Sequence, residues 1–502
     1  MEADRVMSVL PLMAVLLPLA GAIAAVRLQR ISSRVRAIGL GAICSVTAML
    51  SLCLLPGVLR GTVYELHILQ MTPEIWLYMR VDALGALFGA TVACLWLLGL
   101  IYSDGYMKHG HRQGRYYAFF MLCLAWTMGV AYSGNLLTFL IFYELFSVLT
   151  YPLVVHEETP EAIAAGTKYI VYILLGGSLV LLGVVLTFFV AGEQTLTSVP
   201  LLDAGMDHSW LLLIFWCFLA GFGVKAALVP LHGWVPDAHP AAPAPFSAVL
   251  SGVMVAAGSF GIMRVVYQVF GVELLDLLNV MPYMAAIAGF TVFFAAILAV
   301  NQDNLKRRLA YSTISQMAYV TLGIALLNAE ATSGAIIHIT NHAFMKGALF
   351  LCAGLLITRA GIRNVSEMRG IAKRMPITMA AFTLATLGMI GTPPLSGFVS
   401  KWYLGQGILQ ADQPLYLVVL LGGALLAAIY LLPIVYVAYF KEPPAVERSG
   451  ADTDDADAAE APLSMLIPTV IASGLTIVLG LTATLPGMPL SLAAKAVEQF
   501  FR

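Results

Sequence analysis

The feature that most constrains this chain is a succession of apolar runs, each about 20 residues long, from one end to the other. An α-helix rises about 1.5 Å per residue, so one such run crosses the roughly 30 Å hydrocarbon core of a bilayer. Apolar residues make up 60% of the 502 residues, charged residues only 11%, and the mean hydropathy is +0.88. A water-soluble fold cannot bury that much apolar surface. We therefore expect an all-α integral membrane protein.

The apolar runs predict about 14 transmembrane helices within a single membrane domain, 1–502. The spans are placed at 6–26, 37–59, 81–101, 116–133, 135–155, 162–191, 211–229, 246–270, 280–300, 309–328, 333–358, 376–399, 415–440 and 463–487. The first run is too long for a cleaved signal peptide, and Glu2 and Asp4 replace the usual basic start. We divide the domain into three N-terminal spans (1–115), two helix groups (116–270 and 280–440), an acidic loop (441–462), and the last span with a short tail (463–502).

Lysine and arginine gather in the loops that follow odd-numbered spans, 17 of them against 6 on the opposite side. Positively charged loops tend to stay in the cytoplasm, so this asymmetry predicts that both termini lie outside. The expected location is the bacterial cytoplasmic membrane. The net charge of −1 gives no indication of nucleic-acid binding.

Four ionisable residues lie within predicted spans or directly beside one: Glu144, Lys225, Lys346 and Lys401. A charge at the bilayer centre costs about 2.5–3.5 kcal/mol even on the lenient insertion scale, so each needs a partner, water or a function. Lys168 lies near the start of its span, where a lysine can extend to the interface. We expect Glu144, Lys225, Lys401 and Lys346 to form a proton path, with structural ion pairing as the alternative.

Proline and glycine interrupt two of the spans. Span 7 runs into LVPLHGWVPDAHPAAPAP, and span 12 contains GTPPLSG at 391–397. Proline frees carbonyls that lipid cannot satisfy, and paired broken helices indicate an ion site between inverted repeats. We therefore predict two discontinuous helices and two inverted five-helix repeats, spans 4–8 and 9–13; two unrelated kinks are the alternative. Each break has a lysine beside it, Lys225 and Lys401.

Histidines accompany these lysines. His338, His342 and Lys346 are spaced four apart on one helical face, and imidazole exchanges protons near neutral pH, so the row suits a relay. A metal site is the rival interpretation, but no Cys or carboxylate lies nearby in the sequence to complete a ligand set, and we expect none. At the first break, three residues either pass protons or cap helix ends: His232, Asp237 and His239.

Several motifs resemble the antiporter-like subunits shared by Mrp-type multisubunit Na⁺/H⁺ antiporters, respiratory complex I and membrane-bound hydrogenases. The motifs are FYELFSVLTYPLV, GVKAALVPLHGWVPDAHPAAPAPFSAVLSG, DNLKRRLAYSTISQMAY, HITNHAFMKGALFLCAG and GTPPLSGFVSKW, within roughly residues 80–440. The resemblance implies that Glu144 and Lys225 form the ion pair of one half channel and that Lys401 serves the exit half. The family often places a further lysine on span 8, where this chain has Val253–Met254–Val255–Ala256. Either Lys346 with its two histidines takes over the central position, or the relay is interrupted.

The length and short tail most resemble the D-type subunit of an Mrp antiporter. The expected function is proton translocation in a monovalent cation (Na⁺)/H⁺ antiporter; a redox-driven proton pump and a non-conducting scaffold are the alternatives. The sequence has no phosphate loop, nicotinamide fingerprint or cluster-ligand pattern, so we expect no cofactor and no catalytic centre of its own. The expected partners are other integral membrane subunits, protons, Na⁺ and lipids.

Overall fold

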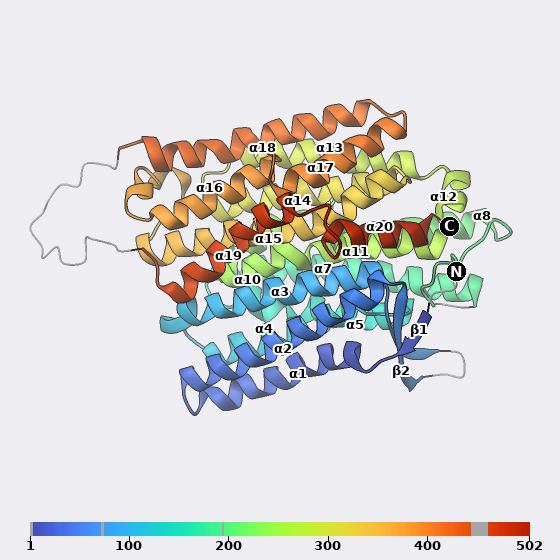
Figure 1. Cartoon of the computed structure of the whole chain (residues 1–502), viewed down its shortest axis with the longest axis horizontal. Helices are drawn as coiled ribbons and strands as arrows, with labels where there is room; N and C mark the ends of the chain where they lie inside the picture. The colour runs from blue at the N-terminus through green and yellow to red at the C-terminus, as the bar shows by residue number, and fades with distance from the viewer. Residues whose placement is uncertain (1–3, 72–74, 193–194, 443–459, 502) are drawn as a thin grey trace, which may run out of the picture.

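The structure, a computed structural model, describes residues 4–71, 75–192, 195–442 and 460–501. Its long helices run roughly side by side along the longest axis of the molecule (Figure 1). Eleven helices among the described residues are long and apolar enough to cross a membrane. This confirms the prediction of a helical, many-span membrane protein.

The helical elements follow the predicted spans in order. They are α1 (Leu10–Gln29), α2 (Ser33–Leu59), α3 (Ala83–Tyr106), α4 (Gln113–Ala131), α5 (Leu136–Leu149), α6 (Tyr151–Val154), α7 (Pro160–Ala191), α8 (His208–Lys225), α9 (Val235–Ala241), α10 (Ala244–Val249), η2 (Leu250–Met254), α11 (Ala256–Arg264), η3 (Val265–Phe270), α12 (Val272–Leu278), α13 (Met281–Val300), α14 (Leu305–Ala325), α15 (Ala329–Ala360), α16 (Pro376–Ile390), α17 (Ser396–Gln410), α18 (Leu415–Phe440), α19 (Leu463–Leu481) and α20 (Pro489–Phe500). Short 3₁₀ turns η1 (Met107–His109), η4 (Val365–Glu367) and η5 (Ile371–Lys373) lie between them, whereas η2 and η3 are π-helical.

The eleven candidates leave out three segments at predicted span positions. Two of them, α4 and α14, are of similar length but begin with polar and basic residues, and the third is the interrupted pair α16–α17. The span predicted at 376–399 is too short, because the segment continues as α17 to Gln410. The segment after Leu481 is likewise more than a short tail, since it forms α20.

A small sheet departs from the all-α expectation. β1 (Asp4–Met7) runs parallel to β2 (Thr62–Gln70), and β2 pairs antiparallel with β3 (Trp76–Val81), with Tyr64 opposite Val81. The β2 sequence TVYELHILQ alternates and is rich in β-branched and aromatic residues, which favour strands. An ion pair between Arg80 and Glu65 at 3.0 Å joins β3 to β2. The prediction was wrong here because the hydropathy pattern treated this segment as a connecting loop.

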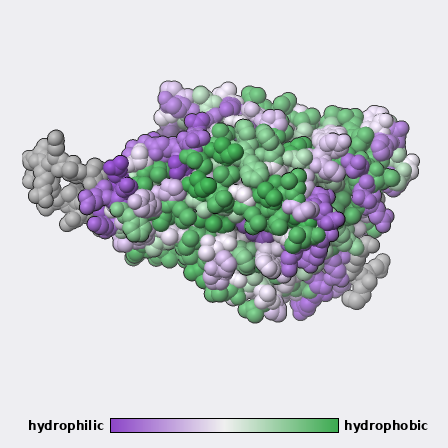
Figure 2. Space-filling model, turned by 90° about the horizontal axis from the view of Figure 1, so that it is seen from above, coloured by the Kyte–Doolittle hydropathy of each residue, from purple (hydrophilic) through white to green (hydrophobic). Residues whose placement is uncertain are grey.

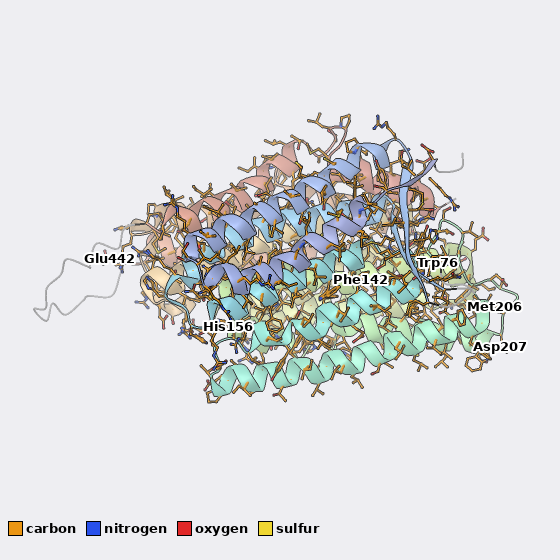
Figure 3. All side chains as sticks on the ribbon, turned by 90° about the horizontal axis from the view of Figure 1, so that it is seen from below. Trp76, Phe142, His156, Met206, Asp207 and Glu442 are labelled. Carbon is orange, nitrogen blue, oxygen red and sulfur yellow. The ribbon has the colours of Figure 1, made fainter. Side chains whose placement is uncertain are left out.

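Both termini lie at the same end of the bundle, beside the sheet (Figure 1). Glu442 and His156 lie toward the opposite end, away from Trp76, Met206 and Asp207 (Figure 3). An even number of membrane crossings requires this arrangement. Which end faces the cytoplasm remains a prediction from the charge asymmetry, and most of the acidic loop 441–462 lies outside the described residues.

The surface and the interior have the polarity expected in a bilayer. Hydrophobic residues cover much of the middle of the molecule, and hydrophilic residues gather toward its two ends (Figure 2). Inside, every residue from 244 to 270 is buried, and so is most of α15. The segment 244–270 and α15 therefore form the centre of the bundle, and His338, His342 and Lys346 on α15 are fully buried.

Candidate functional site

Glu144 lies at the edge of the bundle, where α5 packs against α7. Its side chain is half-buried, and its carboxylate rests on the bare backbone of Gly177 in α7, where a Cβ atom would lie 1.9 Å from Oε1. Oε1 is buried and has no hydrogen-bond partner among the described residues. A buried carboxylate oxygen without a donor is costly, so the position is one where a proton or a moving cation would be favourable.

Lys225 ends α8 and is fully buried. Its Nζ donates to the Tyr169 hydroxyl at 3.1 Å and lies 4.3 Å from the centroid of the Phe146 ring. Tyr169 in turn donates to the carbonyl of Ser147 at 2.7 Å, which connects the lysine to α5. Aromatic faces attract a desolvated cation, so the aromatic side chains around Nζ can hold the ammonium without a carboxylate.

The expected ion pair between Glu144 and Lys225 is not formed in this conformation. No salt bridge joins them among the residues that the structure describes, and the hydroxyl of Tyr169 and the aromatic rings take the place of the carboxylate. The two side chains still lie within electrostatic range of each other. The pair is therefore open here.

The interruption of span 7 lies between Lys225, where α8 ends, and Val235, where α9 begins. Protein groups satisfy its freed backbone: Trp234 Nε1 donates to the Val224 carbonyl at 2.8 Å, and the Val229 amide donates to Thr291 Oγ1 at 3.1 Å. A broken helix at membrane depth requires such partners. The first break therefore begins next to buried Lys225 and is held by protein groups, although Pro230 is exposed.

The accessory residues of this break separate into two kinds. Asp237 accepts from both Lys168 and Arg307 at 2.7 Å, at a partly exposed position that ties α9 to α7 and α14. His232 packs edge-on against Phe294, with ring centroids 5.3 Å apart. His239 is fully buried and stacks on Phe350 of α15, and neither of its ring nitrogens has a hydrogen-bond partner in the described chain. Asp237 thus forms ion pairs at the partly exposed side of the break, and His239 is buried in the interior.

The predicted row on α15 is buried along its whole length. Lys346 Nζ donates to Ser312 Oγ of α14 at 2.6 Å, and the rings of His338 and His342 are 6.2 Å apart. Ser312 Oγ is also hydrogen-bonded to the Tyr430 hydroxyl of α18 at 2.9 Å. The row thus connects sideways to hydroxyl groups that can both donate and accept a proton.

Lys401 sits at the second break, between α16 and α17. Its Nζ donates to the carbonyls of Met389 at 2.7 Å and Ile390 at 2.9 Å, in the last turn of α16. These carbonyls lack helical partners because α16 ends there, and a cation is favourable at a helix C-terminus. The neighbouring Ser400 bonds to His338 Nδ1 at 2.8 Å, so Lys401 and the α15 row meet at this break.

Several members of the site were not identified from the sequence. Tyr169 and Ser400 connect lysine and histidine residues, and Gln316 is fully buried. The polar run STISQ within α14 was the available signal for Ser312 and Gln316. Tyr169 gave no such signal, because a tyrosine in an apolar helix is usually a core residue.

Span 8 adopts a π-helical turn, η2, at the position where the related motif often has a lysine. Val253 and Met254 are buried apolar residues there, and Ser251 bonds to Thr313 of α14 at 2.6 Å. Gly252 packs closely on the backbone of Ala343 in α15. This part of span 8 therefore contributes hydroxyl and backbone groups to the centre of the bundle and no ammonium.

Comparisons with known proteins identify the family and the fold of this chain. The family model described as NADH:quinone oxidoreductase/Mrp antiporter, TM, matches residues 133–427. The chain is 35% identical over 482 residues to NADH-quinone oxidoreductase subunit N of Desulforudis audaxviator, which covers 94% of this chain and 95% of that protein. It is 30% identical over 433 residues to hydrogenase-4 component B of Escherichia coli, covering 81% of this chain and 63% of that protein.

Solved structures share the fold. A chain of the Mrp complex from Dietzia sp. DQ12-45-1b superposes with a TM-score of 0.88 at 24% identity, covering 98% of this chain and 97% of that one. A chain of respiratory complex I from Thermus thermophilus superposes with a TM-score of 0.82 at 20% identity, covering 98% of this chain and 100% of that one. The breadth of the family match and the full-length relative show that this protein belongs to the family of antiporter-like membrane subunits found in NADH:quinone oxidoreductases and Mrp antiporters.

Proposed function

We propose that this subunit carries protons across the membrane within a multisubunit complex, through Glu144, Lys225, the α15 row and Lys401. The observation that supports the proposal best is the burial of the lysines and histidines in this set. Lys225, His338, His342 and Lys346 are each fully buried, and no carboxylate forms a salt bridge with any of them among the described residues. Unpaired buried charges are expensive, so their retention argues for a function that uses them.

The open arrangement of Glu144 and Lys225 supports an electrostatic switch. Two unit charges about 6 Å apart at an effective dielectric near 20 interact by about 2.8 kcal/mol. Closing the pair therefore favours the protonated form of Lys225 by roughly a hundredfold, and opening it removes that support. The lysine then passes its proton inward. The chain itself offers no energy source, so a partner subunit must drive the opening and closing.

For the assembly, the D-type subunit of a Na⁺/H⁺ antiporter is our first proposal, because the motifs resemble the antiporter-like subunits that include this class. A proton-pumping subunit of a redox-driven complex is the second candidate. One observation favours it: the 35% identity to a NADH-quinone oxidoreductase subunit N extends over nearly the full length of both chains. Both assemblies would use the same buried groups, and they differ in what drives the proton.

The test is proton transport in inside-out membrane vesicles that contain the whole complex. We expect Glu144→Ala, Lys225→Ala and Lys401→Ala each to abolish ΔpH-linked transport while the complex still assembles. Lys495→Ala is a matched control, because Lys495 forms an exposed pair with Glu498 three residues away. Normal transport in all three site variants would contradict the proton path and favour the scaffold alternative.

The driving force separates the two assemblies. In an antiporter, Na⁺, K⁺ or Li⁺ added to vesicles with a preformed ΔpH dissipates it, and Lys225→Ala prevents this. In a redox-driven complex, an electron donor generates ΔpH in the absence of any cation gradient. A response to the electron donor and none to the three cations would overturn the antiporter assignment.

A further inference from the structure

Lys306 is a buried cation that the proposed path does not use. It lies in the first turn of α14, after the N-cap residue Asn304, and only 5% of it is exposed. Its charge is poorly placed for its own helix, because the N-terminus of a helix disfavours cations. No salt bridge to Lys306 is found within residues 4–71, 75–192, 195–442 and 460–501. Its position therefore needs another explanation.

The partners of Lys306 lie on the broken helix of span 7. Its Nζ donates to the carbonyls of Ala242 and Pro240, and the distance to Pro240 is 3.3 Å. These carbonyls end α9, so Lys306 does for α9 what Lys401 does for α16. Both broken spans therefore have a lysine ammonium on the final carbonyls of one of their helical halves. One of these lysines is already in the proposed path.

Titratable groups lie on both sides of Lys306. On the inner side is His239 of α9, the residue before Pro240, whose carbonyl accepts from Lys306; its ring stacks on Phe350 of α15, the helix that contains Lys346. On the outer side are Glu157, an exposed residue in the connection between α6 and α7, and Arg363, whose carbonyl accepts from the amide of Leu305. The order Glu157, Lys306, His239, Lys346 leads from the surface to the centre of the bundle. It enters at the end of the bundle that the positive charges predict to be cytoplasmic.

The two ring nitrogens of His239 fit a proton carrier between Lys306 and Lys346. Both ring nitrogens are buried without a hydrogen-bond partner in the described residues, although the ring is held against Phe350. A neutral imidazole always has one nitrogen ready to accept a proton and one N–H ready to donate.

Building on the proposed proton path, we propose that Lys306 is the entrance residue through which protons reach the central row, with Glu157 as its surface partner. The neutral amine of Lys306 takes a proton from a hydronium ion that arrives from the aqueous side beside Glu157, which leaves a neutral water molecule. The ammonium then gives one N–H proton to the free nitrogen of neutral His239, directly or through one water molecule, and becomes a neutral amine again. The imidazolium of His239 releases its other proton toward Lys346. Lys306 keeps its hydrogen bonds to α9 in both charge states, because a neutral amine still has two N–H groups.

Lys306→Arg tests the entrance role in inside-out vesicles that contain the whole complex. Arginine keeps the positive charge and the donors for the carbonyls of α9, but it does not release a proton at accessible pH. We expect the initial rate of proton transport per assembled complex to fall at least tenfold. A residue that only caps α9 would give a rate near that of the unmodified complex, and this result would overturn the proposal.

A second pair of variants decides the matter if Lys306→Arg fails to assemble. Glu157→Gln removes the attractive charge outside Lys306, which disfavours protonated Lys306, so half-maximal transport should shift to lower pH on the exposed cytoplasmic face. Glu158→Gln is the matched control: it makes the same change one residue away, where the carboxylate is bound by Arg112 and Arg115. Equal pH profiles for the two variants would refute the entrance role.

Lys225→Ala is measured in the same vesicles to separate this inference from the function on which it rests. If Lys225→Ala loses transport and Lys306→Arg does not, the proton path stands and the entrance is elsewhere. If Lys225→Ala also transports normally, the proposed function itself is wrong.

Discussion

Gly177→Ala should displace the carboxylate of Glu144 although the substitution replaces no ionisable residue. A methyl group at Gly177 would lie 1.9 Å from Glu144 Oε1 and 2.6 Å from its Cδ. A carbon and an oxygen in contact rest at about 3.5 Å, so the carboxylate must retreat by about 1.6 Å. The obstructing atoms are the far end of a flexible side chain, and we therefore expect the carboxylate to move and the helices to stay.

The effects on stability and on transport should differ. Alanine favours a helix over glycine by about 0.8–1 kcal/mol, and a strained rotamer of Glu144 costs about 0.5–1.5 kcal/mol, so the free energy of unfolding should change little. A displacement of about 1 Å in a reacting group can lower a rate by on the order of a hundredfold. We expect transport per assembled complex to fall between about tenfold and a hundredfold.

The assay is the initial rate of ΔpH formation in vesicles, normalised to assembled complex. Gly41→Ala in α2 and Gly474→Ala in α19 are controls, because an added Cβ meets no heavy atom within 4 Å at either position. Combining Gly177→Ala with Glu144→Asp shortens the acid by one methylene and should restore part of the rate. An unchanged rate in Gly177→Ala would refute the view that the position of Glu144 controls transport.

Three further predictions concern the scaffold. Asp82→Asn should lower the free energy of unfolding by about 3–5 kcal/mol, because it leaves the buried guanidinium of Arg264 without its counter-ion. Thermal unfolding in detergent measures this change. A loss of stability as small as that from breaking an exposed ion pair would contradict the prediction. Glu460→Ala should cost about 1–2 kcal/mol in the same measurement, since the carboxylate accepts from the Ile377 amide and the Thr378 hydroxyl at the start of α16, and an unchanged midpoint would show that water replaces it. Burial, with a smaller contribution from Arg115, lowers the pKa of His156 to about 4, whereas an unfolded histidine titrates near about 6.5. The unfolded state therefore binds more protons between these values, stability should decrease as the pH falls through this window, and His156→Gln should flatten that part of the profile.

The parts of the fold that follow from local chemistry could be predicted from the sequence. Proline marks both breaks, and hydropathy marks the helices around them, so Lys225 and Lys401 were expected beside interrupted helices and are found there. The predicted span 12 ended too early because α17 is amphipathic and contains Lys401 and Gln406, which end an apolar run in the sequence. Strand β2 was missed because its partners, β1 and β3, are set by pairing between segments.

The candidate site divides in the same way. The four-residue spacing of His338, His342 and Lys346 places them on one face of a helix, as the structure shows. The sequence could not predict that Tyr169 would hold Lys225 in place of Glu144, because that choice depends on how α7 packs against α8. The inverted repeats and the Na⁺/H⁺ exchange function remain predictions.

The bonds from Lys401 to the last carbonyls of α16 give this lysine a mechanical role as well as an electrical one. Its ammonium, on α17, is hydrogen-bonded to the last carbonyls of α16 and so links the two halves of the broken helix. In the proposed proton path, a neutral Lys401 amine would keep two N–H groups for these two carbonyls but would lose the charge that strengthens the bonds, so the contact would weaken when the proton leaves. If Lys401 carries protons as proposed, its protonation and the contact between α16 and α17 should change together, and a spectroscopic probe of the distance between these helices would report the charge state of the lysine.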